Sequence, residues 1–363
     1  MTSSGETISG TGKSAEIKAE YKKFVGRKIL FILFSLALIF IIAGVAATLG
    51  SANITFLETY STILHRFFPD HFHTRWLADV VIWNLRLPRI LMGILAGIGL
   101  AVAGTMMQGI LRNPLASPFT LGISAGAGFG AALAITFSAG FIAGEYLIIG
   151  NAFFFALIPT FIILGLTRYR RATPETMVLA GIAMLYIFGA ATTLIEYFAE
   201  AEAVKMAVFW MVGSLGRALW KDLLPVSIVL AVCVPLLMWK SWDVNVMGAG
   251  DETAKSLGVN VERTRIFILM IATLLTAGII SFVGTIGFIG LVAPHMCRMV
   301  IGGDNRFLIP ASGLFGAALL LGADTVARTI IAPVILPVGV LTAFMGGPMF
   351  LYLIIRRKRR EYW

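Results

Sequence analysis

Residues 29–49 read ILFILFSLALIFIIAGVAATL and contain no charged side chain. A helix needs about 20 apolar residues to cross the hydrocarbon core of a bilayer, so this run is long enough to span a membrane. It is also too long for the apolar part of a signal peptide. We therefore predict a helix that stays in the membrane as an anchor.

The rest of the chain continues this apolar character. Of its 363 residues, 58% are hydrophobic and 13% charged, whereas a soluble domain is about half apolar and about a quarter charged. A soluble enzyme of this composition would expose too much apolar surface, and the unbroken runs exclude the alternating strands of a membrane barrel. Nine further runs follow the first, at about Ile90–Leu111, Phe119–Phe137, Tyr146–Leu166, Thr176–Tyr197, Leu224–Trp239, Ile266–Ile280, Phe288–Ile301, Leu308–Ala327 and Val338–Ile355. The sequence thus predicts an all-α polytopic membrane protein with about ten transmembrane helices.

Residues 281–287, SFVGTIG, separate two short apolar runs and indicate a pair of broken helices. Gly284 and Gly287 lie in this segment, and Pro294, next to His295, interrupts the run that follows. Non-helical backbone at membrane depth must be buried in protein or line a wet cavity. We therefore expect these four residues to mark a translocation path.

Small residues four positions apart indicate surfaces where helices pack closely. Gly93 with Gly97 and Gly122 with Gly126 are examples. The stretch GAGFGA at 126–131 contains part of a dinucleotide-binding fingerprint, but no strand precedes it, and that fingerprint requires one. We therefore predict packing rather than nucleotide binding for these glycines.

The basic residues indicate the orientation of the chain. Lys and Arg number 29 against 19 Asp and Glu, a net charge of +10. With an even number of spans and both termini in the cytoplasm, 21 of the 29 basic residues fall on the cytoplasmic side, as the positive-inside rule requires. The excess charge is therefore mostly a topology signal, and no nucleic-acid partner is expected. The apolar runs and this orientation together predict three parts of the chain: a polar cytoplasmic tail (1–28), one transmembrane domain (29–355) with an inner loop at about 240–265, and a basic cytoplasmic tail (356–363).

Two polar features have competing explanations. His65, His71 and His73 lie in the first external loop, but two histidines separated by one residue need a further ligand to hold a metal, so a solvated loop is favoured and no metal site is predicted. Asp324 and Arg328 lie in or at the end of a span, where charged groups are costly and usually functional. Their spacing of four residues lets them pair on one helix face, and a purely structural ion pair is the alternative.

Three stretches carry a resemblance to a known family. The first comprises RLPRIL at 86–91, GTMMQG at 104–109, NPLASP at 113–118 and LGISAG at 121–126; the second is GFIGLVAPHMCR at 287–298; the third comprises DTVAR at 324–328, PVGVLTA at 337–343 and GGP at 346–348. They resemble, in the same order, the permease subunits of binding-protein-dependent (type II) ABC importers of the FecCD-like family, which take up ferric siderophores, haem and cobalamin. The resemblance extends from about Arg86 to Ile355.

The resemblance implies a transport subunit rather than an enzyme, in the cytoplasmic (inner) membrane of a prokaryote. It implies a homodimer or paired permease with a path along the subunit interface, two ATP-binding subunits below and an extracytoplasmic substrate-binding protein above. The chain itself would bind no cofactor, because ATP is used by the partner subunits. A ferric siderophore is the expected substrate, and haem or cobalamin are the alternatives that share these motifs.

The resemblance also assigns roles to two groups of residues. Arg86, Arg89 and Arg328 would face outward and receive acidic side chains of the binding protein; anchoring at the membrane interface is the alternative explanation. The inner loop would couple the permease to the ATPases, with a plain solvated loop as the alternative. Its expected coupling residues are Asp251, Glu252, Ala254, Lys255, Leu257 and Gly258.

A secondary transporter driven by protons or sodium is the main competing function. Such a protein needs carboxylates or broken-helix ion sites near the middle of the membrane. Apart from Asp324, the acidic residues fall in tails, loops or near the ends of spans. A membrane-embedded enzyme is disfavoured as well, since no His, Cys or carboxylate cluster lies within the spans, and no catalytic residue is predicted.

Overall fold

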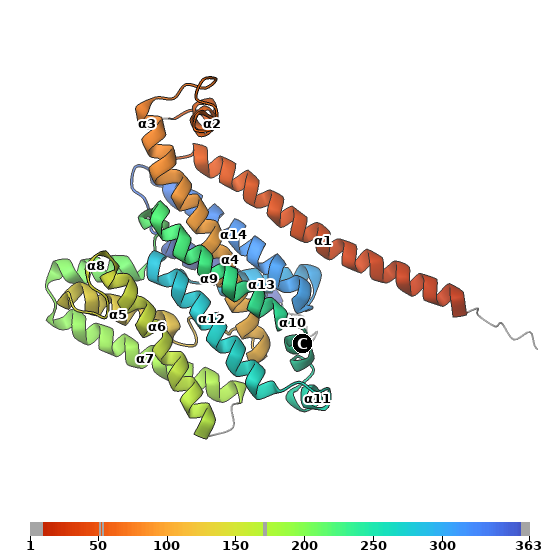
Figure 1. Cartoon of the computed structure of the whole chain (residues 1–363). Coiled ribbons are helices and arrows are strands. Elements are labelled where there is room, and N and C mark those ends of the chain that lie inside the picture. Colours follow the sequence, from red (N-terminus) through yellow and green to blue (C-terminus); the bar gives the residue numbers. More distant parts are fainter. Residues whose placement is uncertain (1–9, 51, 53, 170–172, 357–363) are drawn as a thin grey trace, which may run out of the picture.

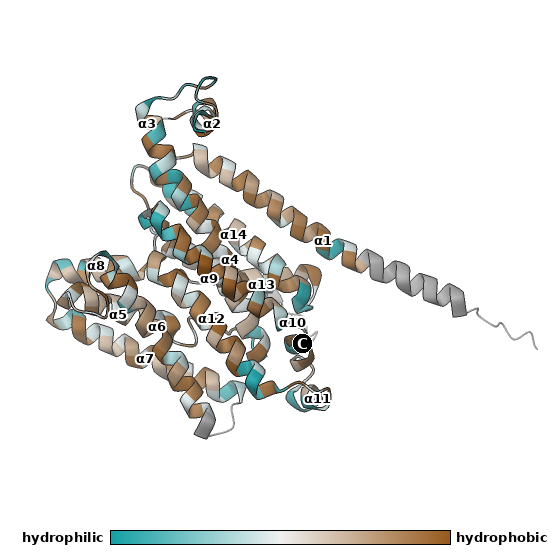
Figure 2. Ribbon diagram, viewed as in Figure 1, coloured by the Kyte–Doolittle hydropathy of each residue, from teal (hydrophilic) through white to brown (hydrophobic). Residues whose placement is uncertain are grey.

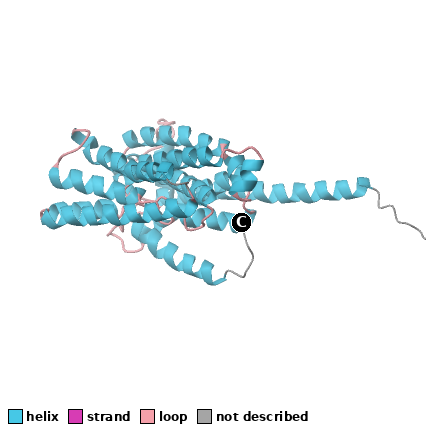
Figure 3. Cartoon of the chain, turned by 90° about the horizontal axis from the view of Figure 1, so that it is seen from below, coloured by secondary structure: helices cyan, strands magenta, loops and turns pink. Residues whose placement is uncertain are grey.

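The computed structural model describes residues 10–50, 52, 54–169 and 173–356. The described chain is helical and contains no strand (Figures 1 and 3). Arg170 and Arg171, which contribute to the predicted orientation, lie outside the described residues, as do residues 1–9 and 357–363 of the predicted tails.

Ten apolar helices correspond one by one to the ten predicted runs. Seven contain a segment long and apolar enough to cross a membrane, and three are shorter. They are α1 (Gly10–Thr48), α4 (Leu87–Leu111), α5 (Ile123–Phe137), α6 (Leu147–Tyr169), α7 (Pro174–Phe198), α9 (Trp220–Trp239), α12 (Val261–Val283), α13 (Ile289–Ile301), α14 (Asn305–Thr329) and α15 (Val338–Arg356). The predicted membrane fold is confirmed.

Short helices occupy the two ends of this bundle. At one end lie α2 (Phe56–His65), α3 (Trp76–Asp79), the π-helix η1 (Val80–Arg86), the 3₁₀ helices η2 (Gly144–Tyr146) and η3 (Leu215–Arg217), and α8 (Ala201–Met211). At the other end lie α10 (Ser241–Met247) and α11 (Asp251–Ser256) (Figure 1). The first end is the predicted outer side and the second the predicted cytoplasmic side.

Helix α1 begins well before its predicted start at residue 29. It includes residues 10–28, most of the predicted polar tail, and projects beyond the body of the protein (Figure 1). This segment contains Ala, Glu and Lys, which favour helix at little cost in side-chain entropy. An apolar helix already nucleated in the membrane can therefore be extended by these residues.

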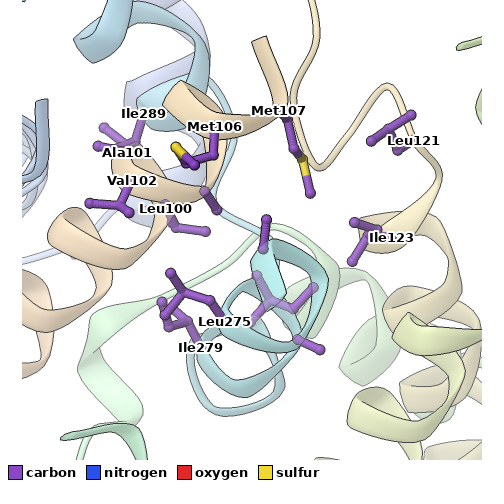
Figure 4. Close-up of a cluster of buried hydrophobic side chains, with 14 of the residues drawn as sticks. Leu100, Ala101, Val102, Met106, Met107, Leu121, Ile123, Leu275, Ile279 and Ile289 are labelled. Carbon is purple, nitrogen blue, oxygen red and sulfur yellow. The ribbon is translucent and has the colours of Figure 1, made fainter. Parts of the chain in front are cut away.

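Helix α4 lies at the centre of the bundle and packs against α14, α12, α13 and α9. Figure 4 shows Leu100, Val102 and Met106 of α4 in a buried cluster with Leu275 of α12 and Ile289 of α13. Hydrophilic residues are concentrated in the short end helices, whereas the long helices are mostly hydrophobic (Figure 2). The buried core is therefore formed around α4.

Glycines permit the close approach of α4 to two neighbours. A Cβ atom on Gly97 would lie 2.5 Å from the Cα of Ala317 in α14, and one on Gly104 would lie 1.8 Å from the carbonyl oxygen of Gly290 in α13. A Cβ on Gly126 of α5 would likewise lie 2.3 Å from the carbonyl oxygen of Phe155 in α6. Gly97, Gly104 and Gly126 thus serve packing, which is the predicted role of Gly97 and Gly126.

Candidate translocation cavity and partner surfaces

The predicted helix break lies beside a cavity of about 780 Å³. Helix α12 ends at Val283, and α13 begins at Ile289 after a non-helical segment in which Gly284 has φ +77° and Phe288 has φ +67°. The cavity is lined by Ser117, Phe119 and Thr120 between α4 and α5, Met211 and Val212 at the end of α8, Thr285, Gly287 and Phe288 in the break, Leu291 of α13, and Gly339, Val340, Ala343, Phe344 and Pro348 of α15. None of these described lining residues is charged.

The four predicted pathway residues occupy different places around this cavity. Gly287 lines it. Gly284 does not, because its backbone packs against the end of α8, where a Cβ would lie 2.3 Å from the carbonyl oxygen of Trp210. Pro294 is buried and His295 is half-buried in α13, and neither lines the cavity, although Leu291 of the same helix does. The structure therefore places Gly287 in the cavity and the other three residues near it.

Pro294 does not interrupt α13, contrary to the sequence prediction. Helix α13 is continuous through it from Ile289 to Ile301. A proline has no N–H to bond to the carbonyl four residues earlier, here that of Gly290. The Gln108 side chain on α4 donates its Nε2 hydrogens to the carbonyls of Gly290 and Leu291 over 3.4 and 3.3 Å. A neighbouring helix thus supplies the missing donor, and the helix persists.

The three arginines of the predicted docking site are buried rather than free to face a partner. Arg86, Arg89 and Arg328 are 4%, 7% and 6% exposed. The Nε of Arg89 donates to both carboxylate oxygens of Asp324 over 3.0 Å, and its NH2 donates to Oδ1 over 2.7 Å. The Nε of Arg328 lies 3.2 Å from Oδ2 of the same carboxylate. The expectation that these side chains face outward therefore does not hold in this structure.

Arg86 and Arg328 have a second set of partners at the end of α1. The NH1 of Arg86 donates to the carbonyls of Ala47 and Thr48 over 2.6 and 2.9 Å. Arg328 donates to the carbonyls of Ala46 and Leu49, both over 3.1 Å. Carbonyls in the last turn of a helix lack partners and attract cations. The arginines thus join α1, α4 and α14 at the predicted outer end, and the predicted Asp324–Arg328 pair is present.

The inner loop forms two short helices, and its predicted coupling residues divide into buried and exposed ones. Ala254 is fully buried in the main core. In contrast, Glu252, Lys255, Leu257 and Gly258 are exposed, with 66% of Leu257 accessible. The expectation that Ala254 offers close contact to a partner therefore does not hold here, whereas the other side of α11 is accessible.

Two glycines set the ends of α11. Gly250 precedes it with φ +112°, and Gly258 follows it with φ +86°, conformations that favour glycine. The N–H of Gly258 donates to Lys255 O, and the N–H of Val259 donates to Ala254 O, which is the hydrogen-bond pattern of a Schellman motif. Gly258 thus ends the helix and presents Leu257 at its tip.

Ion pairs hold the inner loop to the membrane helices. Asp251 accepts two hydrogen bonds of 3.1 Å from the NH2 of Arg265 on α12, and Arg112 lies 3.4 Å from the same carboxylate. Asp251 is therefore a structural anchor of α11, although the sequence placed it with the partner-contacting residues.

A second anchor, centred on Asp304, was not predicted. This residue caps α14 and binds Asn245 of α10 over 2.8 Å and Arg306 over 2.7 Å, with Lys28 of α1 3.5 Å away. Burial alone would raise the pKa of Asp304, but the hydrogen bonds from Arg306 and Asn245 outweigh it and lower the pKa well below its ordinary value. An Asp four residues before the apolar run at Leu308 was the available signal for this cap.

The histidine-containing loop shows no metal centre. The ring of His65 hydrogen-bonds the carbonyl of Phe72, while His71 and His73 are exposed. Within the described residues, no group of three or more His, Cys, Asp or Glu side chains could hold a metal ion.

The described residues form ten apolar helices, a cavity without charged lining residues and an exposed short helix at one end, which are the features of a polytopic membrane permease. The chain belongs to the FecCD transport family, which matches residues 35–356. It is therefore the permease of a type II ABC importer, a transport subunit rather than an enzyme, in the inner membrane of a prokaryote. Permeases of this kind act with ATP-binding and substrate-binding partners.

Individual relatives agree with this assignment. The chain is 48% identical to an ABC transporter permease protein of Methanocaldococcus jannaschii, over 95% of this chain and 99% of the relative. It is 39% identical to the hemin transport system permease HmuU of Yersinia pestis, over 90% and 96%. It also matches a solved inward-facing structure of a metal-chelate type ABC transporter at 28% identity, with a TM-score of 0.78 over 90% of this chain and 99% of that one.

Proposed function

We propose that this permease moves an iron chelate, received from an extracytoplasmic binding protein, across the cytoplasmic membrane at the expense of ATP. The uncharged cavity beside the helix break carries the proposal, because a bulky chelate needs a wide and weakly binding path. A ferric siderophore is the substrate we favour, from its breadth of use in the family. Haem and cobalamin are the alternative substrates, and similarity to a hemin permease supports haem.

We further propose that two copies of the chain, or two related chains, form the path between them, with two ATP-binding subunits at the end that carries α10 and α11. The cavity is bounded on one side by α15, where Phe344 is 74% exposed, and a second permease would enclose it. This arrangement places both termini and the α10–α11 loop in the cytoplasm. The Lys and Arg distribution supports that orientation.

The binding protein would dock at the opposite end, above the arginines. Because Arg86, Arg89 and Arg328 already have partners within the chain, we propose that they hold the outer ends of α1, α4 and α14 in the shape that the binding protein recognises. A direct contact with the partner would require its carboxylates to displace Asp324 or the carbonyls of α1.

An ion-coupled transporter remains a less favoured function. The one fully buried carboxylate among the described residues of the long helices is that of Asp324. Two arginines neutralise it, so it has no vacant coordination for a transported proton or sodium ion. This ion pair therefore supports a structural role for Asp324.

Transport in proteoliposomes is expected to require the cognate ATP-binding subunit and ATP. The described chain contains only helices and lacks the strand that must precede a phosphate-binding loop, so the energy has to come from a partner. The measurement is uptake of the chelate that the cognate binding protein retains, with ATP, without ATP, and with an imposed proton or sodium gradient. Uptake driven by an ion gradient alone would refute the proposal.

Replacing Leu257 with Asp is expected to weaken association with the ATP-binding subunit about tenfold or more. The side chain is exposed at the tip of α11, and burying an unpaired carboxylate in a partner cleft is costly. Co-purification and titration of the ATP-binding subunit measure the effect. Leu57 supplies the matched control L57D, because it is exposed in α2 at the opposite end of the helix bundle. Equal affinities of the two variants for the ATP-binding subunit would show that α11 is not in the interface.

A further inference from the structure

Arg265 connects the exposed helix α11 to the central helix α4. Its side chain is 3% exposed at the start of α12. The NH2 group binds both oxygens of Asp251 on α11 over 3.1 Å, and Nε donates to the carbonyl of Ile110 over 3.1 Å. Ile110 lies in the last turn of α4, whose carbonyls have no partner within the helix. One guanidinium thus joins three helices.

The same turn of α4 is joined to the wall of the cavity. Gln108, two residues before Ile110, is fully buried and binds the carbonyls of Gly290 and Leu291 at the start of α13. The first of these carbonyls is the one that Pro294 leaves without a helical donor. Leu291 itself lines the cavity. The contact therefore connects α4 to the cavity at the point where α13 is least able to satisfy its own backbone.

The backbones of α4 and α13 also touch directly. A Cβ on Gly104 would lie 1.8 Å from the carbonyl oxygen of Gly290, and one on Gly290 would lie 2.7 Å from that of Leu100. Helices in contact at this distance cannot slide past each other without separating, because close-packed interiors leave no free volume. A displacement of α4 therefore displaces the beginning of α13 as well.

We propose that Arg265 is the positioning residue that transmits movement of α11 to the cavity, through Ile110 and Gln108 of α4 and the first turn of α13. The proposal rests on the proposed role of α11 as the contact with the ATP-binding subunits. A guanidinium suits this position, because its planar array of donors can hold a carboxylate and a carbonyl at the same time. Lysine offers a single ammonium group and would not keep both contacts in this geometry.

Accessibility of the cavity provides the test. We would label the variant V340C with a maleimide in the complex with the ATP-binding subunit, comparing the nucleotide-free state with the state trapped by Mg-ATP and vanadate. Val340 lines the cavity, whereas the native Cys233 and Cys297 are buried. In V340C alone, the labelling rate should differ between the two states. Adding R265Q should reduce that difference about tenfold, while ATP hydrolysis stays within about twofold of its rate in V340C.

Arg263 supplies the matched control. It lies on the same turn of α12, but its side chain is exposed, so R263Q should leave both the labelling difference and hydrolysis unchanged. An undiminished labelling difference in R265Q would overturn the proposal. So would an equal loss in R263Q and R265Q, because a general effect of charge would then suffice.

A second variant separates transmission from folding. D251N keeps the bond between Arg265 and Ile110 and removes only the negative charge that Arg265 binds on α11, so it should also reduce the labelling difference, with thermal unfolding close to that of the parent. If R265Q does not assemble with the ATP-binding subunit, the D251N variant provides the test. An unchanged labelling difference in D251N then overturns the proposal. If V340C itself shows no nucleotide-dependent labelling, the proposed ATP-driven function fails together with the inference. A response in V340C that R265Q and D251N both preserve overturns the inference alone.

Discussion

Replacing Asp324 with Ala is expected to destabilise the protein by about 3–5 kcal/mol, the cost of removing one partner from a buried ion pair. Asp324 is fully buried and is the shared counterion of Arg89 and Arg328. Without it, two buried guanidinium groups repel each other in a medium of low dielectric constant. The thermal midpoint of unfolding in detergent, with the monodisperse fraction in size-exclusion chromatography, measures the loss.

Asp70 provides the control for this substitution. It is exposed in the predicted outer loop and has no ion pair in the described structure, so D70A should leave the midpoint unchanged. The variant in which Asp324, Arg89 and Arg328 are all replaced by apolar residues should recover much of the stability lost in D324A, because no uncompensated charge remains at that site. A midpoint for D324A equal to that of the native protein would contradict a structural role for the ion pair.

Replacing Gly104 with Ala is expected to destabilise the protein by about 3 kcal/mol, at the upper end of the usual range for overpacking. The new methyl group would coincide with the carbonyl of Gly290, which lies 1.8 Å from the ideal Cβ position. Because the obstacle is backbone, no side chain can rotate away, and α4 and α13 have to separate. The separation would also lengthen the bonds of Gln108 to α13.

The same substitution at Gly165 of α6 is expected to have the opposite sign. A Cβ there meets no atom within 4 Å, and alanine is favoured over glycine inside a helix by about 1 kcal/mol. G104A and G165A can be compared by thermal unfolding of the two variants in the same detergent. Equal effects of the two changes would show that α4 and α13 are not as closely packed as described here.

The helices of this protein were predictable because the membrane imposes one simple requirement, a long run of apolar residues. All ten runs form helices, but the ends of α1 and the continuity of α13 were not foreseen. Both depend on interactions that a hydropathy pattern does not contain. Helix α1 extends beyond the membrane through residues that favour helix, and α13 passes Pro294 because Gln108, far away in the sequence, supplies a hydrogen bond.

The site residues were less predictable than the helices. The four-residue spacing was enough to predict the pair Asp324–Arg328, but the stronger partner, Arg89, lies 235 residues from Asp324 in the sequence. A single sequence also does not show whether a small residue on a short helix contacts a partner protein or packs inward against its own chain. Ala254 is an example, since it is buried while its neighbour Leu257 is exposed.

Helix α14 is fixed at both of its ends, by Asp304 to α1 and α10 and by Asp324 to α4. Helices α1 and α14 are therefore held together near both of their ends, by Lys28 with Asp304 and by Arg328 with the last turn of α1. Helix α4 is joined to them at one end only, through Arg89 and Asp324. We therefore expect that a change of access in this protein is a rigid-body tilt of α1, α4 and α14 against helices α5 to α8. A single rotation of this kind would displace the predicted outer end and the end that carries α10 in opposite directions.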